Sequence, residues 1–235
     1  MTDLKFLRKE LKLKSDPRRA KLLQGFFKTG PGEYGEGDIF LGITVPEVRK
    51  TATKFNELKF SDVKKLLGSK IHEERLTALL ILVHNFNIGN EAERNKIFKF
   101  YLANTKNINN WDLVDLSAHK IVGEHILDRS RNILYKLARS KKLWEKRISI
   151  ISTFAFIRDN ELKDSLKISE ILLNDDHDLI HKAVGWVLRE VGKKSLATEE
   201  KFLKKHYKKM PRTMLRYAIE KFPEKKRKAY LKGNI

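Results

Sequence analysis

The stretch HEERLTALLILVHNF, residues 72–86, places apolar side chains at three- and four-residue intervals and holds neither glycine nor proline. This spacing predicts an α-helix with a wide apolar face. Four other segments resemble it: NNWDLVDLSAHKIVG (109–123), LWEKRISIISTFAFI (143–157), HDLIHKAVGWVLREVG (177–192) and PRTMLRYAIEKFP (211–223). The five segments follow one another at spacings of 40, 32, 35 and 33 residues when they are aligned on Ala78, Ala118, Ile150, Gly185 and Ala218.

Shorter amphipathic stretches lie between these segments, and each can pair with a neighbour: EAERNKIFKFYLANT, RSRNILYKLAR, LKDSLKISEILLN and TEEKFLKKHYKK. This alternation is typical of two-helix repeats of the HEAT type, which stack into a curved solenoid with a concave face. We therefore predict an all-α fold of HEAT-like repeats in one domain, residues 1–235. Residues 1–60 would hold N-terminal helices and a glycine-rich loop, and residues 61–235 the repeats. A non-repetitive helical bundle is the alternative.

The N-terminal part departs from this pattern in KTGPGEYGEGDIFLGITVPEVRK, residues 28–50, which carries five glycines. We expect a helix to start at Pro46, since proline suits the first turn of a helix. A P-loop is excluded because the stretch has no G-K-S/T, and its acids (Glu33, Glu36 and Asp38) would repel phosphate. We interpret the loop 29–38 as a flexible connector that caps the solenoid, with a loop that flanks the substrate as the alternative.

The charge balance points to a polyanionic partner. Lysine and arginine number 50 against 30 acidic residues, a formal net charge of +20. From Lys193 to the end there are 15 basic residues and 4 acidic ones. Such an excess favours nucleic acid over a small neutral metabolite and predicts a basic concave face on the solenoid. A solvated basic surface without a ligand is the alternative.

Several other classes of protein are disfavoured by the sequence. There are no cysteines, and the seven histidines show no metal-binding spacing, so we expect neither a metal nor another cofactor. The N-terminus lacks the apolar run of a secretory signal, and no stretch of about 18 apolar residues occurs. We therefore expect a soluble, monomeric, cytoplasmic protein that does not associate with membranes and that joins the nucleoid when bound to DNA.

Candidate chemistry lies in the segment 109–123. Trp111 and Asp115 are four residues apart and therefore share one face of a helix, whereas Asp112 points elsewhere. The apolar residues of this helix would pack inward, which leaves Trp111 and Asp115 at the margin of a groove. The alternative is that one of the acids caps the helix and that Trp111 belongs to the core.

Two further segments carry similar combinations. Lys182, Trp186 and Arg189 fall on one face of a predicted helix, and Trp144 and Arg147 are three residues apart on another. A glycine inside a helix, here Gly185, usually has a packing reason because it costs about 1 kcal/mol relative to alanine. The three tryptophans thus all lie on the five main segments, although aromatic residues at helical spacing are more often core than site.

The stretches FLGITVPEVRK, HEERLTALLIL, WDLVD, LWEKR and GWVLRE occur in this order over about 150 residues. Together they resemble the AlkD-like DNA glycosylases of the DNA alkylation repair family, and the resemblance covers nearly the whole chain. It implies a HEAT-like solenoid that holds double-stranded DNA on its basic concave face. It also implies excision of N3- and N7-alkylated purines, such as 3-methyladenine and 7-methylguanine, without base flipping.

The same resemblance implies roles for individual residues. Asp115 is similar to the catalytic aspartate of the family, and Trp111 and Trp186 to the two indoles packed against the deoxyribose of the lesion. Arg147 and Arg189 are similar to arginines on the DNA-facing surface, which Lys182 would join. Phe26 takes the place of a family tyrosine, and Asp178 and Leu179 replace an aromatic pair, so DNA grip and lesion preference are the properties that these departures affect.

The chemistry explains why a basic protein would hold an acid at this point. An alkylated purine already carries positive charge and leaves readily, so positive charge develops on the deoxyribose. A carboxylate stabilises that charge, and indole faces offer a cation–π surface. A monofunctional alkylpurine glycosylase is therefore the favoured hypothesis. The alternatives are a non-catalytic basic HEAT module that binds DNA or structured RNA and an adaptor solenoid that binds proteins.

Overall fold

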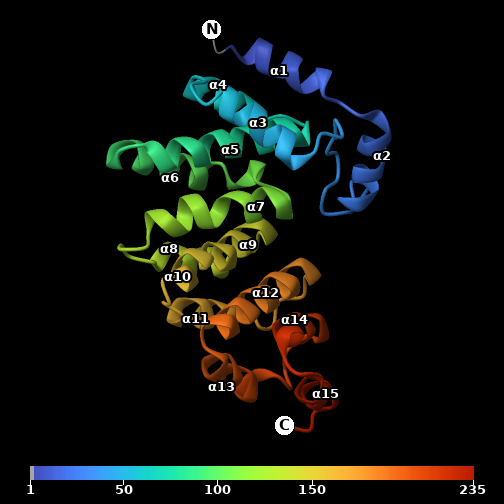
Figure 1. Ribbon diagram of the computed structural model, residues 1–235, viewed down its shortest axis with the longest axis vertical. Helices are drawn as coiled ribbons and strands as arrows, with labels where there is room; N and C mark the ends of the chain where they lie inside the picture. Colours follow the sequence, from blue (N-terminus) through green and yellow to red (C-terminus); the bar gives the residue numbers. More distant parts are fainter. Residues whose placement is uncertain (1–2) are drawn as a thin grey trace. The chain divides into compact units, whose positions relative to one another are not determined.

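The structure is a computed structural model that describes residues 3–235, and in this part of the chain the regular elements are all helical (Figure 1). The first seven α-helices are α1 (Leu4–Leu13), α2 (Pro17–Phe26), α3 (Val45–Lys54), α4 (Phe60–Leu67), α5 (His72–Ile88), α6 (Glu91–Ala103) and α7 (Trp111–Ala118). The others are α8 (Asn132–Ala138), α9 (Leu143–Ser152), α10 (Phe154–Arg158), α11 (Lys163–Ile171), α12 (Asp178–Lys194), α13 (Leu196–His206), α14 (Arg212–Ala218) and α15 (Glu224–Lys232). Three short elements complete the fold: the 3-10 helices η1 (Thr105–Asn107) and η3 (Ile219–Lys221), and the π-helical turn η2 (His119–Gly123).

The chain divides into two compact units, Met1–Ser117 and Ala118–Ile235. In the first unit α5 is the central helix and contacts α1, α3, α4 and α6. Residues 72–83 of α5 are buried without interruption, including four ionisable side chains in its first turn. A helix that is buried on all sides needs apolar residues all round, and the run LTALLILV supplies them.

The central helix of the second unit is α12, which contacts α9, α11, α13 and α14. Gly185 explains how closely α14 approaches it. A Cβ atom at this position would lie 2.5 Å from both the Met214 carbonyl oxygen and the Tyr217 Cβ. The packing reason that the sequence suggested for this glycine is thus the backbone of a neighbouring helix.

The predicted all-α fold is confirmed. The five main segments coincide with α5, with α7 and η2, with α9 and α10, with α12, and with α14 and η3. The intervening stretches form α6, α8, α11 and α13, and α3 begins at Val45, one residue before the expected start. The single HEAT-like domain and its basic concave face concern the arrangement of the two units and stay predictions. Every helix among residues 3–235 is too short or too polar to cross a lipid bilayer.

Candidate active site

The N-terminal end of α7 carries the predicted indole and acid. Asn110 precedes the helix, and its side-chain oxygen accepts a hydrogen bond of 2.8 Å from the backbone N–H of Trp111. Trp111 and Asp115 are both half-buried and lie within the same helix, as the sequence predicted. The described helix therefore places the two side chains one turn apart on adjoining positions of its surface.

Trp111 lies flat against Phe27. Their ring centroids are 4.9 Å apart and the planes differ by only 7°. Phe26, the predicted DNA contact, meets Trp111 edge-on at 5.9 Å and is 64% exposed, whereas Phe27 is 7% exposed. One face of the indole is thus covered by a buried ring, and an exposed ring stands at its edge.

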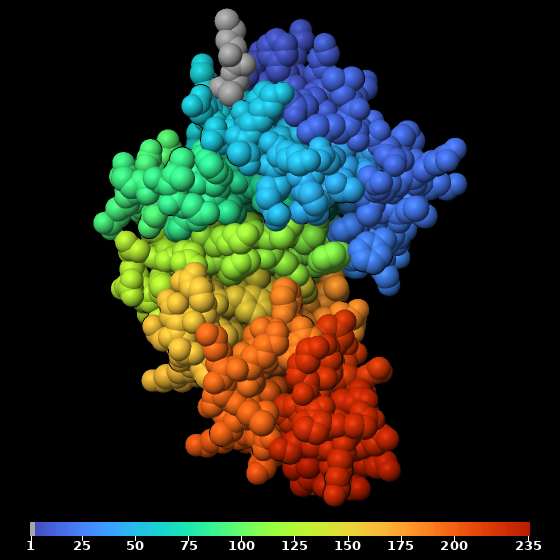
Figure 2. Space-filling model, viewed as in Figure 1, coloured from blue at the N-terminus to red at the C-terminus, as the bar shows by residue number. Residues whose placement is uncertain are grey.

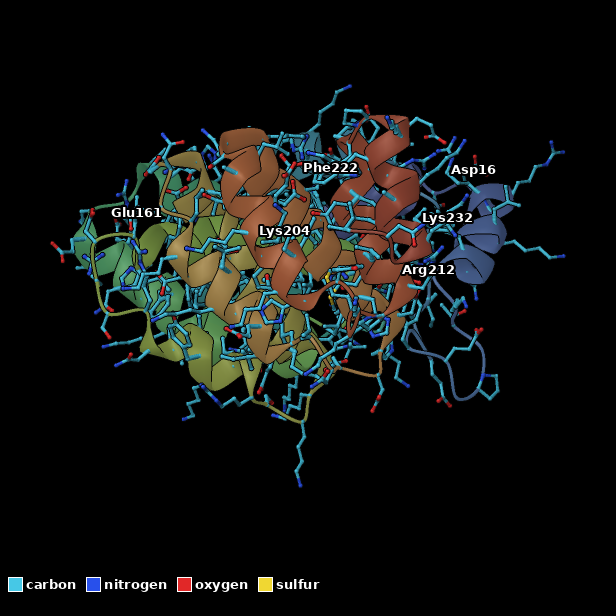
Figure 3. The ribbon with its side chains drawn as sticks, turned by 90° about the horizontal axis from the view of Figure 1, so that it is seen from below. Asp16, Glu161, Lys204, Arg212, Phe222 and Lys232 are labelled. Carbon is cyan, nitrogen blue, oxygen red and sulfur yellow. The ribbon has the colours of Figure 1, made fainter. Side chains whose placement is uncertain are left out.

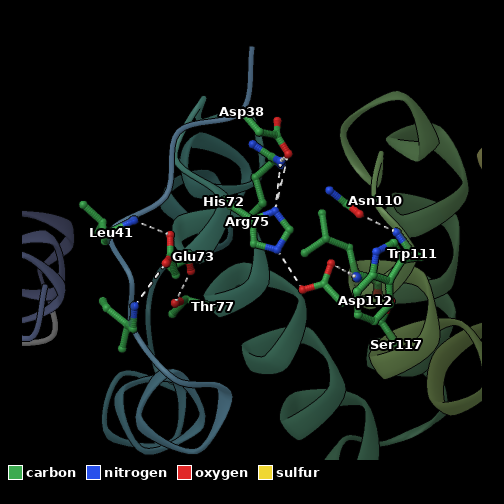
Figure 4. Close-up of polar contacts among 12 residues, drawn as sticks. Asp38, Leu41, His72, Glu73, Arg75, Thr77, Asn110, Trp111, Asp112 and Ser117 are labelled. Carbon is green, nitrogen blue, oxygen red and sulfur yellow. Dashed lines mark hydrogen bonds and ion pairs between the residues drawn. The ribbon is translucent and has the colours of Figure 1, made fainter. Parts of the chain in front are cut away.

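Asp112 has a different environment from Asp115. It is buried, and its carboxylate accepts a 2.7 Å hydrogen bond from Nε2 of His72 (Figure 4). On the other side of the imidazole, Nδ1 lies 3.4 Å from the Asp38 carboxylate, which also accepts a 2.5 Å hydrogen bond from Arg75. The structure therefore gives Asp112 a partner inside the protein, as expected for the acid that points away from Trp111.

The charges of this buried group stabilise one another. Burial acts to lower the pKa of His72, but the charge and hydrogen bond of Asp112, with the hydrogen bond of Asp38, outweigh it and raise that pKa. Burial acts to raise the pKa of Asp38, and His72 and Arg75 outweigh it and lower that pKa. His72 is therefore favoured as a cation between two carboxylates.

The segment that directly follows the glycine-rich loop, residues 39–43, is fixed to the start of α5. Glu73 accepts hydrogen bonds from the backbone N–H groups of Leu41 (2.9 Å), Gly42 (2.8 Å) and Ile43 (3.2 Å). Ile39 pairs with Ile71 in an isolated parallel bridge. Gly42 has a φ of +82°, and a Cβ there would lie 2.2 Å from the Asp16 carbonyl oxygen, so the tight path requires glycine.

Acids within the loop also bind its own backbone. Glu33 accepts from the N–H of Gly30 at 2.9 Å, and Glu36 from the N–H of Gly32 at 3.0 Å. These carboxylates satisfy backbone N–H groups within the loop. The interpretation of the loop as a flexible connector, and the alternative that it flanks the substrate, stay predictions. The loop lies beside the candidate site, since Asp38 at its end and Phe40 just after it both contact His72.

Asp115 lies close enough to Tyr101 for its charge to act on the phenol. Tyr101 is fully buried, and its hydroxyl is 2.8 Å from the hydroxyl of Ser117. Burial raises the pKa of Tyr101, the hydrogen bond with Ser117 lowers it, and the negative charge of Asp115 raises it further. The phenol therefore stays neutral beside the candidate catalytic acid.

In the second unit Trp186 is half-buried on α12, and its ring is tilted against Phe154 with 4.7 Å between centroids. Arg189 forms ion pairs with Glu190 and Glu220. Lys182 forms an ion pair with Asp178 at 2.7 Å. The three predicted residues of α12 thus lie on one helix, and both cations have acidic partners.

Arg147 is only 5% exposed, and its Nη1 donates a 2.5 Å hydrogen bond to the carbonyl oxygen of Leu179. Leu179 and Asp178 are two of the three positions at which the sequence departs from the pattern that the resemblance implies, and each contacts a predicted DNA-binding cation. The burial of Arg147 gives it a structural contact in this protein, and its contact with DNA stays a prediction.

Exposed cations gather on the C-terminal helices. Lys204 on α13 and Lys232 on α15 are exposed, and Figure 3 labels them together with Arg212 on α14. On the face shown in Figure 2, side chains of α14 and α15 (red) lie at the surface. Further exposed lysines in this region are Lys201, Lys205, Lys208, Lys209 and Lys225. The basic excess read from the sequence is therefore at the surface of the second unit.

Sequence reasoning missed three side chains that contact the candidate residues: Phe27, His72 and Phe154. His72 opens the motif HEER, and four ionisable residues at the start of an otherwise apolar helix are a usable signal for a buried polar network. Phe27 and Phe154 lie at ordinary apolar positions, and nothing in their local sequence separates them from core residues.

The fold and the site define an all-helical, strongly basic protein with a half-buried indole and carboxylate on one helix. The chain belongs to the DNA alkylation repair enzyme family, whose model matches residues 7–222. A solved structure described as a predicted DNA alkylation repair enzyme from Enterococcus faecalis has the same fold, with a TM-score of 0.68 and 15% sequence identity. That match covers 90% of this chain and 98% of the other. Comparison with curated proteins finds no match. Membership supports an enzymatic role in DNA repair.

Proposed function

We propose that the protein is a monofunctional DNA glycosylase that hydrolyses the N-glycosidic bond of N3- and N7-alkylated purines in double-stranded DNA. The observation that carries the proposal is the pair on α7: a half-buried indole stacked on Phe27 and, one helical turn later, the half-buried carboxylate of Asp115. The family and the net charge of +20 support a DNA substrate.

In this mechanism the N-glycosidic bond breaks and its electron pair goes with the purine, which leaves as a neutral base. The positive charge then lies on the deoxyribose. Asp115 stabilises that charge and orients the water that attacks the anomeric carbon. The indoles of Trp111 and Trp186 lie against the deoxyribose, as the family resemblance implies. In this proposal the site contacts the deoxyribose and not the base. It therefore requires no pocket for a flipped base, and the base stays in the duplex.

The basic residues contribute affinity for DNA, and the carboxylate of Asp115 contributes to the rate of the reaction. Lys182, Arg189 and Arg147 would contact phosphates, with Phe26 as an exposed apolar contact at the edge of Trp111. Both cations of α12 have acidic partners, so DNA would exchange an internal ion pair for a phosphate contact. The Lys182–Asp178 pair is exposed and costs little to break, because a surface salt bridge contributes about 0–1 kcal/mol, whereas the Arg189 side chain is largely buried.

The experiment is single-turnover release of 7-methylguanine from a duplex by saturating protein, against a control without protein. Asp115→Asn keeps the side-chain volume and removes the charge. We expect it to lower the rate by roughly 10²-fold or more, because one preorganised electrostatic group contributes about 2.7–4 kcal/mol. Duplex affinity and melting temperature should stay at the level of the parent protein.

Two outcomes would contradict the proposal. Release no faster than in the control would assign the chain to non-catalytic basic modules that bind DNA or structured RNA. Release by Asp115→Asn at the rate of the parent protein would keep the glycosylase activity and remove Asp115 from the reaction.

A further inference from the structure

The buried group around His72 ties together three segments of the first unit. Asp38 comes from the glycine-rich loop, His72 and Arg75 from the first turn of α5, and Asp112 from the first turn of α7. All four residues are at most 7% exposed. Figure 4 shows the imidazole between the two carboxylates, with Trp111 next to Asp112 on the same helix.

A series of stacked rings runs beside these polar contacts. His72 stacks on Phe40 at 4.4 Å, Phe40 on Phe27 at 4.9 Å, and Phe27 on Trp111 at 4.9 Å. Two sets of contacts therefore connect His72 with α7. One is the hydrogen bond to Asp112, and the other is the stack that ends on the indole next to Asp112.

Stability alone gives little reason for this arrangement. Replacing a buried ion pair by well-packed apolar side chains is often neutral or stabilising, because the charges must be removed from water. A network of directional bonds does something that an apolar contact does not: it permits one arrangement of the groups it joins. Here the joined groups are the starts of α5 and α7 and the segment of Asp38 and Phe40, and Phe40 stacks on the ring that lies under Trp111.

We propose that His72 is a positioning residue of the candidate site. It holds Asp112 and Phe40 in place, so that Trp111 lies flat on Phe27 and α7 presents Asp115. The consequence for excision rests on the proposed function, whereas the consequence for Trp111 does not. His72 has no contact with the reacting atoms in this scheme. Its effect passes through Asp112 and the stacked rings.

The first test measures Trp111 directly. In a Trp144→Phe, Trp186→Phe background Trp111 is the one remaining tryptophan, since the chain has three. His72→Phe keeps a ring on Phe40 and removes both hydrogen bonds. We expect a red-shifted emission maximum and at least a twofold rise in the acrylamide quenching constant. Asp112→Asn, which keeps the shape of the side chain, should move both values in the same direction.

The matched control is His84→Phe. His84 lies on the same helix, and its Nε2 is 2.8 Å from the Asn56 amide, so this change also removes a hydrogen-bonded imidazole from α5. It should leave the emission and quenching of Trp111 unchanged. Unchanged values in both His72→Phe and Asp112→Asn, or an equal change in His84→Phe, would overturn the positioning role.

The second test measures excision with all three tryptophans present. His72→Phe and Asp112→Asn should each lower the single-turnover rate about tenfold with unchanged duplex affinity, and His84→Phe should match the parent protein. Rates within twofold of the parent for both variants would overturn the effect on excision. If the parent protein releases no base, the proposed function fails, and the fluorescence of Trp111 still decides the positioning role.

Discussion

Glu199 on α13 is a buried carboxyl group outside the candidate site. It is 2% exposed, and its Oε1 has no hydrogen-bond partner among the described residues. Burial and the nearby charge of Glu200 raise its pKa from 4.5 to about 8, against a smaller opposing effect of Arg189. The side chain is therefore mostly protonated at neutral pH, and its ionisation at higher pH leaves an unpaired charge in the interior.

The sign of the resulting pH dependence follows from the proton bound on folding. The pKa of Glu199 is higher in the folded than in the unfolded protein. The contribution of Glu199 to the free energy of unfolding is therefore complete below pH 4.5 and is lost as the pH rises through about 8. Glu199→Gln cannot ionise and should be more stable than the parent at pH 8.5 by a few kcal/mol, since one pKa unit corresponds to about 1.4 kcal/mol. The gain should shrink toward pH 5.5.

Thermal melts at pH 5.5, 7.0 and 8.5 test this expectation, with Glu170→Gln as the control. Glu170 is exposed and forms an ion pair with Lys205, so its substitution should give no gain that grows with pH. A difference between Glu199→Gln and the parent that is constant over this range would contradict a raised pKa for Glu199.

Trp186 is the second residue whose role can be separated from packing. It is half-buried and contacts Phe154. We expect Trp186→Ala to lower excision of 7-methylguanine while the melting temperature falls by only a few degrees. Truncation of a fully buried tryptophan instead costs about 3–5 kcal/mol. A large loss of thermal stability would assign Trp186 to the core of the second unit.

At the scale of elements, the contact between α12 and α14 depends on one missing side chain. Gly185→Ala would place a Cβ atom 2.5 Å from the Met214 carbonyl oxygen, which is backbone and cannot turn away. We expect a destabilisation of about 1–3 kcal/mol, the typical cost of overpacking. Chemical denaturation at equilibrium measures it.

The matched substitution is Gly25→Ala on α2, where a Cβ atom would meet nothing within 4 Å. Replacing a helical glycine by alanine without a clash should stabilise the protein by about 0.5–1 kcal/mol. The two changes are chemically identical and should have opposite signs. Equal stabilisation by both would contradict the close approach of α14.

The elements also separate what the sequence could predict from what it could not. The apolar spacing of residues 72–86 and its four relatives predicted the helices, because helical periodicity is a local property. The i, i+4 rule placed Asp115 beside Trp111 and separated it from Asp112. The partner of Asp112 could not be found in this way, since His72 precedes it by 40 residues. The hydrogen bonds from Leu41, Gly42 and Ile43 to Glu73 could not be predicted for the same reason, since these residues precede Glu73 by about 30 positions.

At the scale of the whole molecule, the charge of +20 predicts how binding to DNA depends on salt. The logarithm of the affinity for undamaged duplex should fall linearly with the logarithm of salt concentration, by roughly 0.9 for each phosphate neutralised. Base sequence should have little effect, because phosphate contacts carry no sequence information. A titration at several salt concentrations with two unrelated duplexes measures both, and a flat salt dependence would contradict an electrostatic interface.

The hydrogen bonds of His72 span 34 residues to Asp38 and 40 to Asp112, so the support of the candidate site depends on contacts between distant parts of the chain. Contacts this distant in sequence form only after long loops have closed, which makes them slow steps of folding. In stopped-flow refolding we expect the helical signal in the far ultraviolet to recover before the fluorescence of Trp111. A chain that ends before α7 would lack both Trp111 and Asp112, and His72 would lose one of the two carboxylates that flank it.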